Sequence, residues 1–497
     1  MYALDAWRGP RFGQGPRTVG TSFQTSGIYV FLISFACVYY LSNTSLLLGH
    51  YDLGWHLAAG DLIRERGSVP FQDPWAFTLA DKHWYNVSWL WDVIASVVFQ
   101  YTGLGGLTLF VVACGAIIVG YLTSLCLSSG ASVPAVCISV LSVSVLYPAF
   151  ATPPNIYLAA SPNTATMLFS VIFFGECLKR TRCFLLPAMM ALWVNLHGGF
   201  VLGFLIIGLF GAVALLRRDW ANFKLYGLTG TGCFIAIFIN PLGCHIYDGV
   251  TATLGHFVQA NITEWQSYFH NVTMPGSIPG IIYVLIFVVL ELRNRGSSAV
   301  PIEARLLSWL FLCLGFYQYR YMSFFFLFST IPLALHLGRL LPEGLARLEV
   351  QKSLLAAGII GMCALPLAFA HIRPALALPD ELLSEQDARY LSANFSHARI
   401  LNHWNVGGIL IFRTHGAVPV FIDGRAATAY PDGLLRDYFK LVKWDIDEDS
   451  WDTILEKYKI DAVFWPTAHD VLKSFLVGKR GWKEQYVGSH ESLYVKP

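Results

Sequence analysis

Long apolar runs separated by short polar segments fill most of the first 375 residues of the chain. Eleven of these runs have roughly the 17–25 residues that cross the hydrocarbon core of a bilayer as a helix. They lie at about 26–48, 105–127, 132–149, 163–178, 183–198, 199–216, 222–240, 277–292, 304–319, 322–340 and 353–371. The pattern predicts a polytopic α-helical membrane protein with about eleven transmembrane helices.

A shorter apolar run at 87–102 contains Asp92 and is rich in tryptophan. If this run does not cross the membrane, four later basic clusters share one side with the arginines of the N-terminal segment, as the positive-inside rule requires. If it crosses, all four move to the opposite side. The clusters are Lys179/Arg180/Arg182, Arg217/Arg218/Lys224, Arg293/Arg295/Arg305 and Arg339/Arg347/Lys352. We therefore predict a helix on the membrane surface, where Trp89, Trp91 and Tyr101 anchor it.

This choice fixes the expected domains and their sides of the membrane. Residues 1–25 form a cytoplasmic segment, and residues 26–375 form a membrane domain in the cytoplasmic (inner) membrane. A long first external loop, 49–104, carries two interfacial helices at about 53–66 and 87–101. Residues 376–497 form a soluble domain on the same extracytoplasmic side as that loop.

The soluble C-terminal region alternates short β-type runs with helical stretches, which predicts a small α/β domain. The expected strands are Ala398–Leu401, Gly408–Phe412, Val418–Ile422, Ala462–Trp465 and Ser492–Val495, and the expected helices are at about 433–443, 449–458 and 467–476. Asp423 and Arg425 follow the third of these strands, on a turn expected to be exposed. Such a pair is usually a structural ion pair.

Composition agrees with a membrane protein and narrows the functions. Hydrophobic residues make up 55% of the chain, charged residues only 13%, and the mean hydropathy is +0.52. A net charge of +2 gives no reason to expect a nucleic-acid partner. The chain has no P-loop, no GxGxxG opening a βα unit, no HExxH and no GxSxG, which disfavours a nucleotide-driven pump and a serine hydrolase.

Asp52, just beyond the first apolar run, is the first candidate for chemistry. A carboxylate at the membrane boundary can bind a divalent cation or take a proton from an acceptor hydroxyl. Aspartate is also a favoured N-cap residue, so the equal alternative is that Asp52 caps a helix that begins at Leu53. His56 lies one helical turn further on and can share a face with Asp52. Trp55 is beside it.

Two further external turns carry polar residues. The Asn195-Leu-His-Gly-Gly199 hairpin allows a tight return, and His197 is expected to project into the external cavity or to cap the turn. Arg320, flanked by tyrosines, suits a phosphate group but is equally compatible with snorkelling to lipid head groups. Glu264 is a second external carboxylate that can approach Asp52. The aromatic residues of 75–101 suit interface anchoring and, less specifically, sugar stacking.

The layout and several motifs together resemble the GT-C superfamily of integral-membrane glycosyltransferases. The motifs are Asp52-Leu-Gly-Trp-His-Leu-Ala-Ala-Gly60, Asp73-Pro74, the stretch from Trp84 to Trp89, Leu192 to Gly199, Asn240-Pro241, Glu264-Trp265, Arg320 and Phe421-Ile-Asp-Gly-Arg425. The resemblance covers nearly the whole chain and is closest to a bacterial group of GT-C-like membrane proteins. It implies a GT-C fold and sugar transfer from a polyprenyl-phosphate donor, outside the membrane, to a protein, lipid or glycan.

Carried onto this chain, the resemblance gives Asp52 the role of catalytic base or metal ligand, with Mg²⁺ or Mn²⁺ as the cation. The predicted catalytic residues are Asp52, His56 and His197, and the predicted substrate-binding residues are Trp55, Trp84, Asn86, Asn195, Glu264 and Arg320. The chain departs from metal-using members because its second external loop, Ala151 to Asn163, has no acidic residue.

The expected function is therefore a membrane glycosyltransferase whose partners are a lipid-linked sugar donor, membrane lipids and an extracytoplasmic acceptor. The alternative is a non-catalytic membrane scaffold that docks a partner protein through the first loop and the C-terminal domain. A transporter is a weaker third hypothesis, because charged residues within the apolar runs are few and no pair of broken helices stands out.

Overall fold

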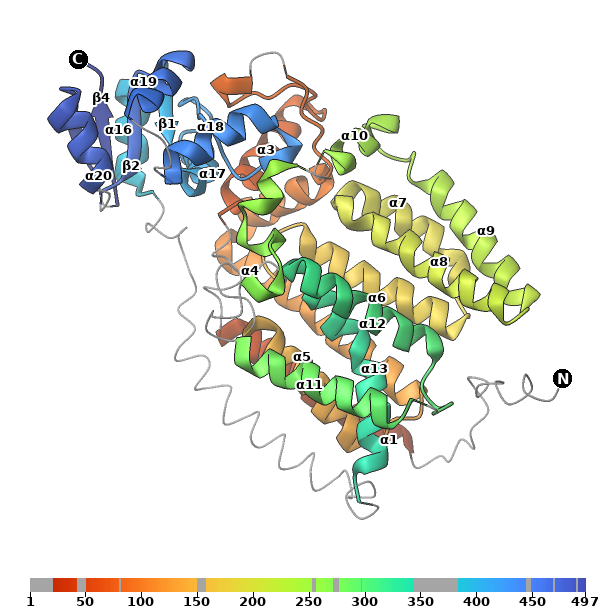
Figure 1. The fold of residues 1–497 in the computed structure, drawn as a ribbon. Coiled ribbons are helices and arrows are strands. Elements are labelled where there is room, and N and C mark those ends of the chain that lie inside the picture. Colours follow the sequence, from red (N-terminus) through yellow and green to blue (C-terminus); the bar gives the residue numbers. More distant parts are fainter. Residues whose placement is uncertain are drawn as a thin grey trace.

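The computed structural model has a helical body with a smaller domain containing a β-sheet at one end (Figure 1). It describes residues 21–42, 51–79, 82–149, 158–252, 256–270, 277–295, 297–342, 383–443, 448–467, 470–488 and 490–497, and the structural statements below concern these residues. The C-terminal domain lies next to helix α3 (Leu53–Arg66) and above the body in this view.

The helical body consists of apolar helices that run side by side. They are α1 (Thr21–Ser42), α4 (Trp89–Ser128), α5 (Val133–Ala149), α6 (Asn163–Lys179), α7 (Leu186–Leu196), α8 (Val201–Leu216), α9 (Trp220–Ala236), α11 (Ser277–Arg293), α12 (Ile302–Tyr317) and α13 (Met322–Leu340). Each predicted span within the described residues is helical, whereas 353–371 and the end of 26–48 lie outside them. Three stretches are long and apolar enough to cross a membrane, Trp89–Ser128, Gly198–Leu216 and Tyr319–Leu340. The number of about eleven spans stays a prediction.

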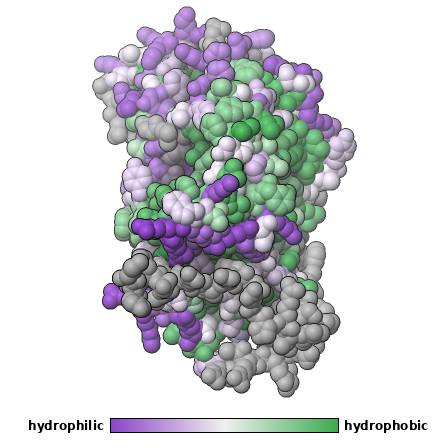
Figure 2. Space-filling view, turned by 90° about the vertical axis from the view of Figure 1, so that its right-hand side faces the viewer, coloured by the Kyte–Doolittle hydropathy of each residue, from purple (hydrophilic) through white to green (hydrophobic). Residues whose placement is uncertain are grey.

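The surface of the body is apolar over a wide area. Figure 2 shows hydrophobic residues over the middle of one face, with hydrophilic residues gathered above and below them. Helices α8 and α9 expose large apolar side chains, among them Leu205, Leu228, Phe234 and Ile235. Water-soluble proteins rarely expose so many neighbouring apolar side chains. The surface and the apolar helices therefore indicate a membrane location.

The first loop contains the helices that the sequence predicts. Helix α3 spans Leu53–Arg66 as expected, and the helix predicted at 87–101 is the first part of α4. Gly103, with φ of 64°, interrupts the helical geometry between this part and the apolar remainder of α4. Glycine adopts such a conformation without a steric penalty. The position of both helices at the membrane surface stays a prediction.

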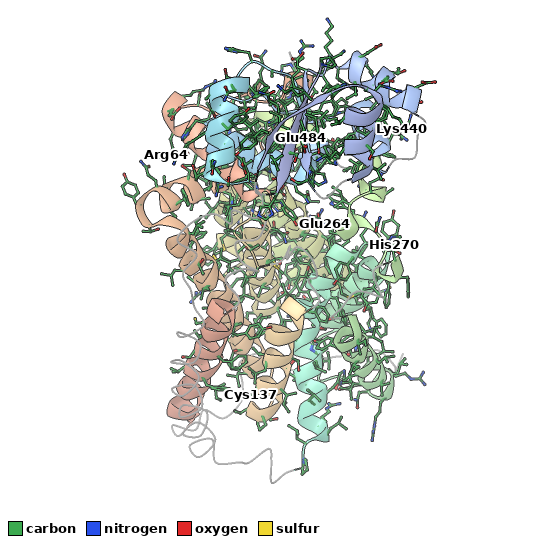
Figure 3. The ribbon with its side chains drawn as sticks, turned by 90° about the vertical axis from the view of Figure 1, so that its left-hand side faces the viewer. Arg64, Cys137, Glu264, His270, Lys440 and Glu484 are labelled. Atoms are coloured by element: carbon green, nitrogen blue, oxygen red, sulfur yellow. The ribbon has the colours of Figure 1, made fainter. Side chains whose placement is uncertain are left out.

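The segment between α9 and α11 is made of short helical turns. They are η5 (Gly243–His245), α10 (Ile246–Thr251), η6 (Phe257–Ala260), η7 (Thr263–Trp265) and η8 (Tyr268–His270). Glu264 and His270, labelled in Figure 3, lie between the C-terminal domain and the body. The backbone N–H of Phe257 donates to Asp432 of the C-terminal domain at 2.9 Å, so this segment contacts both parts of the protein.

The C-terminal domain has a four-stranded sheet in the order β1-β2-β4-β3. The strands are β1 (Ile400–Asn402), β2 (Ala462–Pro466), β3 (Lys483–Val487) and β4 (Glu491–Val495), with β1 and β2 parallel and the other pairs antiparallel. The helices are α16 (Glu385–Phe395), α17 (Trp404–Arg413), α18 (Asp432–Lys443), α19 (Glu448–Lys457) and α20 (Asp470–Lys473), which continues as a π-helix over Ser474–Lys479.

Some of the predicted elements of this domain are wrong. The run Gly408–Phe412 is part of helix α17 and not a strand, because a short apolar run fits a buried helix as well as a strand. The run Val418–Ile422 is extended but forms only isolated bridges at Val420. The sequence analysis missed α16 and β3. Strand β3 lies at the edge of the sheet and has the sequence Lys-Glu-Gln-Tyr-Val. This sequence lacks the clear alternation of apolar and polar residues by which a half-buried strand is predicted.

The first loop and the C-terminal domain share backbone hydrogen bonds. Val420 bridges in parallel to Ile400 of β1 on one side and to Ala76 of the first loop on the other. The N–H of Val420 donates to the carbonyl of Trp75 at 3.0 Å, and the N–H of Phe77 donates to the carbonyl of Val420 at 3.2 Å. A Cβ on Gly54 of α3 would lie 2.5 Å from the carbonyl oxygen of Gly408. The two helices α3 and α17 therefore touch through glycines.

Glu491 in β4 makes the stability of the C-terminal domain pH-dependent. Burial and the neighbouring charge of Asp387 raise the pKa of Glu491 to about 8. The folded domain therefore keeps a proton that the unfolded chain loses above about pH 4.5. Its stability is fully present below that pH and falls as the pH rises to about 8. We expect unfolding of the domain at pH 8 to cost at least about 1.4 kcal/mol less than at pH 5 through this group, one pKa unit being worth that amount.

Glu491→Gln tests this expectation, because glutamine resembles the protonated acid. Thermal unfolding of purified protein between pH 5 and 8 should depend less on pH in the variant than in the wild-type protein. Glu456→Gln, at an exposed position of α19, should leave the slope unchanged. Equal slopes in Glu491→Gln and wild-type protein would contradict the raised pKa.

Candidate functional site

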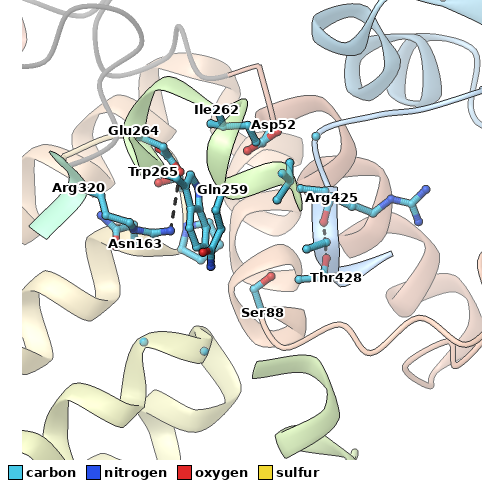
Figure 4. Close-up of a pocket in the computed structure, with 18 of the residues that line it drawn as sticks. Asp52, Ser88, Asn163, Gln259, Ile262, Glu264, Trp265, Arg320, Arg425 and Thr428 are labelled. Atoms are coloured by element: carbon cyan, nitrogen blue, oxygen red, sulfur yellow. Dashed lines mark hydrogen bonds and ion pairs between the residues drawn. The ribbon is translucent and has the colours of Figure 1, made fainter. Parts of the chain in front are cut away.

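A cavity of about 1080 Å³ lies where the helical body, the first loop and the C-terminal domain meet. Figure 4 shows Glu264, Trp265 and Arg320 on one side of it and Asp52, Arg425 and Thr428 on the other. Eight of the nine predicted site residues line this cavity. They are Asp52, Trp55, His56, Trp84, Asn86, His197, Glu264 and Arg320.

Six helices begin at the cavity. Residues at the N-terminal ends of α3, α4, α6, α8, α13 and α17 all line it, and α8 and α13 begin there through the short turns η4 (Gly198–Phe200) and η9 (Tyr319–Tyr321). A helix N-terminus carries a partial positive charge and unpaired N–H groups. The basic residues Lys179, Arg217 and Arg339 lie at the opposite ends of α6, α8 and α13. The cavity therefore lies at the end of the body opposite these basic residues. The partial positive charges of the helix N-termini converge there.

Asp52 does not cap α3 with its side chain. It occupies the N-cap position, but its carboxylate makes no capping hydrogen bond. It lies instead against Gly424 of the C-terminal domain, where an added Cβ would be 1.6 Å from Oδ1. A side chain at position 424 would therefore displace the Asp52 carboxylate. The same added Cβ on Gly424 would lie 3.4 Å from Trp55 Nε1. This buried N–H of Trp55 has no hydrogen-bond partner among the described residues.

His56 is held by a buried carboxylate that the sequence analysis did not choose as a site residue. Its Nδ1 is 2.6 Å from Oδ1 of Asp92. Asn86 donates to the other oxygen of Asp92 at 2.7 Å, and Ser88 donates to the side-chain oxygen of Asn86. A carboxylate inside an apolar helix such as α4 is the signal that could have identified Asp92.

His197 lies in the turn between α7 and α8, as the glycine hairpin predicts. Its Nδ1 is 2.7 Å from the hydroxyl of Thr166, which also accepts from Trp193 Nε1 at 3.1 Å. A Cβ on Gly199 would lie 2.3 Å from the same hydroxyl, so the turn needs glycine there. Both Arg320 and His56 are close enough to act on His197 electrostatically. Burial, together with the charges of Arg320 and His56, lowers the pKa of His197 to about 3, so that His197 is a neutral hydrogen-bonding group beside them.

Arg320 and Glu264 face each other and not Asp52. Arg320 Nη1 is 3.8 Å from Oε1 of Glu264, and its guanidinium lies 4.3 Å from the ring centre of Trp265 (Figure 4). Glu264 and Asp52 therefore line the same cavity, but Glu264 pairs with Arg320. A planar guanidinium stacked on an indole keeps its remaining N–H groups available for an anion.

Asn195 is the predicted site residue that is not among those lining the cavity. Its amide accepts from Trp89 Nε1 at 2.8 Å and donates to the carbonyls of Ala191 and Ile239 at 2.7 and 2.8 Å. These bonds hold α7, α4 and the end of α9 together. Asn195 thus positions the helices that carry the site.

The pair Asp423–Arg425 is a structural ion pair, but it is not exposed. Arg425 donates to both oxygens of Asp423, at 2.8 and 2.7 Å, and pairs with Asp73 of the first loop. Burial alone would lower the pKa of Arg425, but the charges of Asp423 and Asp73 raise it well above its usual value. The guanidinium also lies 4.7 Å from the ring centre of Trp84. The turn is buried because the first loop covers it.

The donor set does not fit a metal ion. No group of three or more His, Cys, Asp or Glu side chains suited to a metal occurs in the described part of the chain. Asp92 is already bonded to His56 and Asn86, and Glu264 to Arg320. We therefore derive no step through the cation that the resemblance implies.

The fold is that of GT-C membrane glycosyltransferases, as predicted. The archaeal oligosaccharyltransferase AglB from Archaeoglobus fulgidus, solved with an inhibitory peptide and a dolichol-phosphate, matches with a TM-score of 0.60 and 10% identity, over 93% of this chain and 71% of AglB. ArnT from Cupriavidus metallidurans matches with a TM-score of 0.52 and 14% identity, over 96% of this chain and 98% of ArnT. No protein-family model matches the sequence, and a search of curated proteins finds no match.

Proposed function

We propose that this protein is a membrane glycosyltransferase that moves a sugar from a polyprenyl-phosphate donor to an acceptor on the extracytoplasmic side. The convergence of Asp52, His56, His197 and Arg320 on one cavity, at the end where six helices begin, carries the proposal. Basic side chains and helix N-termini together favour an anionic group such as the phosphate of the donor. The AglB structure, which contains a dolichol-phosphate, gives further support.

In the proposed reaction an acceptor atom attacks the anomeric carbon of the donor sugar. The bond from that carbon to the phosphate oxygen breaks, and its electron pair leaves with the polyprenyl phosphate. Asp52 takes the proton of the acceptor, and Arg320, His56 and His197 stabilise the negative charge that develops on the phosphate. The C-terminal domain, which places Gly424 against Asp52, closes the acceptor side.

Transfer of a labelled sugar from a polyprenyl-phosphate donor pool tests the proposal. Membranes that contain the wild-type protein should form a labelled product, and membranes from cells without it should not. The alternative is a scaffold that docks a partner protein and transfers nothing. No product, together with a stable protein partner after purification, would overturn the enzyme and support the scaffold.

Arg320 is expected to contribute strongly to the rate. Arg320→Ala should lower the initial rate by about 10²–10³-fold, the usual cost of losing one preorganised donor at a developing charge. The rate of Arg320→Lys should lie between the rates of Arg320→Ala and the wild type, because lysine keeps the positive charge but lacks the planar guanidinium group. The measurement is the initial transfer rate at equal amounts of purified protein.

Arg339→Ala is the matched control, since Arg339 lies in the last turn of the helix that begins beside Arg320. It should leave the rate within about twofold of the wild type, as surface changes away from a site usually do. Equal rates for Arg320→Ala and Arg339→Ala would exclude Arg320 from the phosphate site.

A further inference from the structure

The contact between α3 and α4 contains a buried carboxyl group that packing alone does not require. Asp92 is 0% exposed and His56 is 3% exposed. Both oxygens of the carboxylate are used, one by Nδ1 of His56 and one by the amide of Asn86. An asparagine at position 92 has nearly the same shape and avoids the cost of burying a carboxylate, which amounts to several kcal/mol. The charge itself therefore needs an explanation.

The backbone around this contact is arranged to bring the two side chains together. A Cβ on Gly60 would lie 2.1 Å from the carbonyl oxygen of Asp92, so the helices approach each other as closely as their backbones allow. His56 lies one turn before Gly60, on the part of α3 that borders the cavity. Because Nδ1 is turned toward Asp92, Nε2 is the ring nitrogen left for the cavity.

We propose that Asp92 is a positioning residue that keeps His56 protonated and directs its Nε2–H to the phosphate of the donor. This inference rests on the proposed function. A carboxylate beside one ring nitrogen fixes the orientation of an imidazole and favours its charged form. An imidazolium held in this way donates a charge-assisted hydrogen bond through Nε2, which is stronger than a neutral one. No proton has to be transferred to the phosphate in this role.

The other charged groups around His56 make the carboxylate necessary. Arg320 and His197 share the cavity with His56, and a positive charge on Arg320 opposes protonation of the imidazole. Asp52 lies one turn away at the start of α3. Helix α17, which packs against α3, meets it through Gly408, and its N-cap residue His403 also lines the cavity. Among the described residues, Asp92 is thus the anion that bonds directly to His56.

The affinity for farnesyl phosphate between pH 5 and 9 tests the inference without any need for turnover. Asp92→Asn should bind about 10-fold more weakly than the wild type at pH 7.5, and the difference should shrink toward pH 5.5, because a lower pH favours an imidazolium even without the carboxylate; tenfold corresponds to one pKa unit. His56→Gln should bind weakly at every pH, and the double variant should show no further loss. Asp248→Asn is the matched control, since Asp248 forms an exposed pair with His245 at 2.8 Å.

The outcomes separate the inference from the proposed function. If the wild type binds farnesyl phosphate and Asp92→Asn binds equally well at every pH, Asp92 does not act through His56. If Asp92→Asn binds farnesyl phosphate more weakly by the same factor at every pH and also unfolds at a lower temperature, Asp92 has only a structural role. If the wild type binds no phosphate and transfers no sugar, the proposed function fails. Nitrogen NMR of labelled histidine would then still measure whether Asp92→Asn lowers the pH at which His56 loses its proton.

Discussion

Replacing Asp52 by asparagine is expected to lower sugar transfer by roughly 10²–10⁴-fold, the usual contribution of a positioned general base. Asparagine has the shape of aspartate but cannot accept the proton of the acceptor. The loss should not come from unfolding, because asparagine has nearly the volume of aspartate and can occupy the same place against Gly424. The measurement compares transfer by wild-type and variant protein in membranes at equal protein level, with a labelled polyprenyl-phosphate donor pool.

Asp61→Asn provides the matched control. Asp61 lies on the same helix, two turns further on, and its side chain is partly exposed and bonded to Ser96 and Arg64. This variant should keep transfer within about threefold of the wild type, as expected for a partly exposed residue away from the site. Transfer retained in Asp52→Asn would show that another group takes the proton. Glu264, the other carboxylate that lines the cavity and faces Arg320, would be tested next.

Replacing Arg425 by leucine should destabilise the protein by about 3–5 kcal/mol, the usual cost of removing one partner of a buried ion pair. Asp73 and Asp423 would then remain buried without their cation. Asp73 belongs to the first loop and Asp423 to the C-terminal domain. The substitution should therefore mainly weaken the contact between the first loop and the C-terminal domain. Thermal unfolding and hydrogen exchange at Phe77 and Val420, whose backbones bond across this contact, measure the effect.

The surface pair Lys457–Asp437 is the control for this prediction. Its atoms are 2.6 Å apart, but the lysine side chain is 57% exposed. Lys457→Ala should therefore cost less than about 1 kcal/mol. A variant with Asp73→Asn, Asp423→Asn and Arg425→Leu together should recover part of the stability, because no charge is then left buried without a partner. If Arg425→Leu and Lys457→Ala lower the stability by similar amounts, water must reach the ion pairs that Arg425 forms with Asp73 and Asp423.

The arrangement also explains how the C-terminal domain takes part in the site. Phe421 to Arg425 follows the extended segment that joins the first loop, so the same turn carries both the ion pair and Gly424. Arg425 is bonded to Asp73, 352 residues earlier in the sequence. A loss of this contact should therefore lower transfer as well as stability. Asp52, the proposed catalytic base, thus lies against a turn that one buried ion-pair network holds in place.

The sequence by itself determined the apolar helices and singled out eight of the residues that line the cavity. Runs of apolar residues and their flanking charges are local properties, so α3 and the apolar helices of the described body could be predicted from them. Asp52, His56, His197 and Arg320 could be chosen because polar groups at the ends of apolar helices are costly without a role. The resemblance to GT-C proteins pointed to the same residues.

Only the tertiary structure decided which of these residues meet and what holds them. Burial of Asp92 beside His56, and of Arg425 beneath the first loop, depends on contacts between segments far apart in the chain. The apolar run Gly408–Phe412 belongs to helix α17, whose Gly408 packs against α3 and whose Gly407 packs against Ile422, contacts that no local pattern reveals. Local propensity and hydrophobic pattern are short-range, whereas pairing and burial of charges are set by long-range packing.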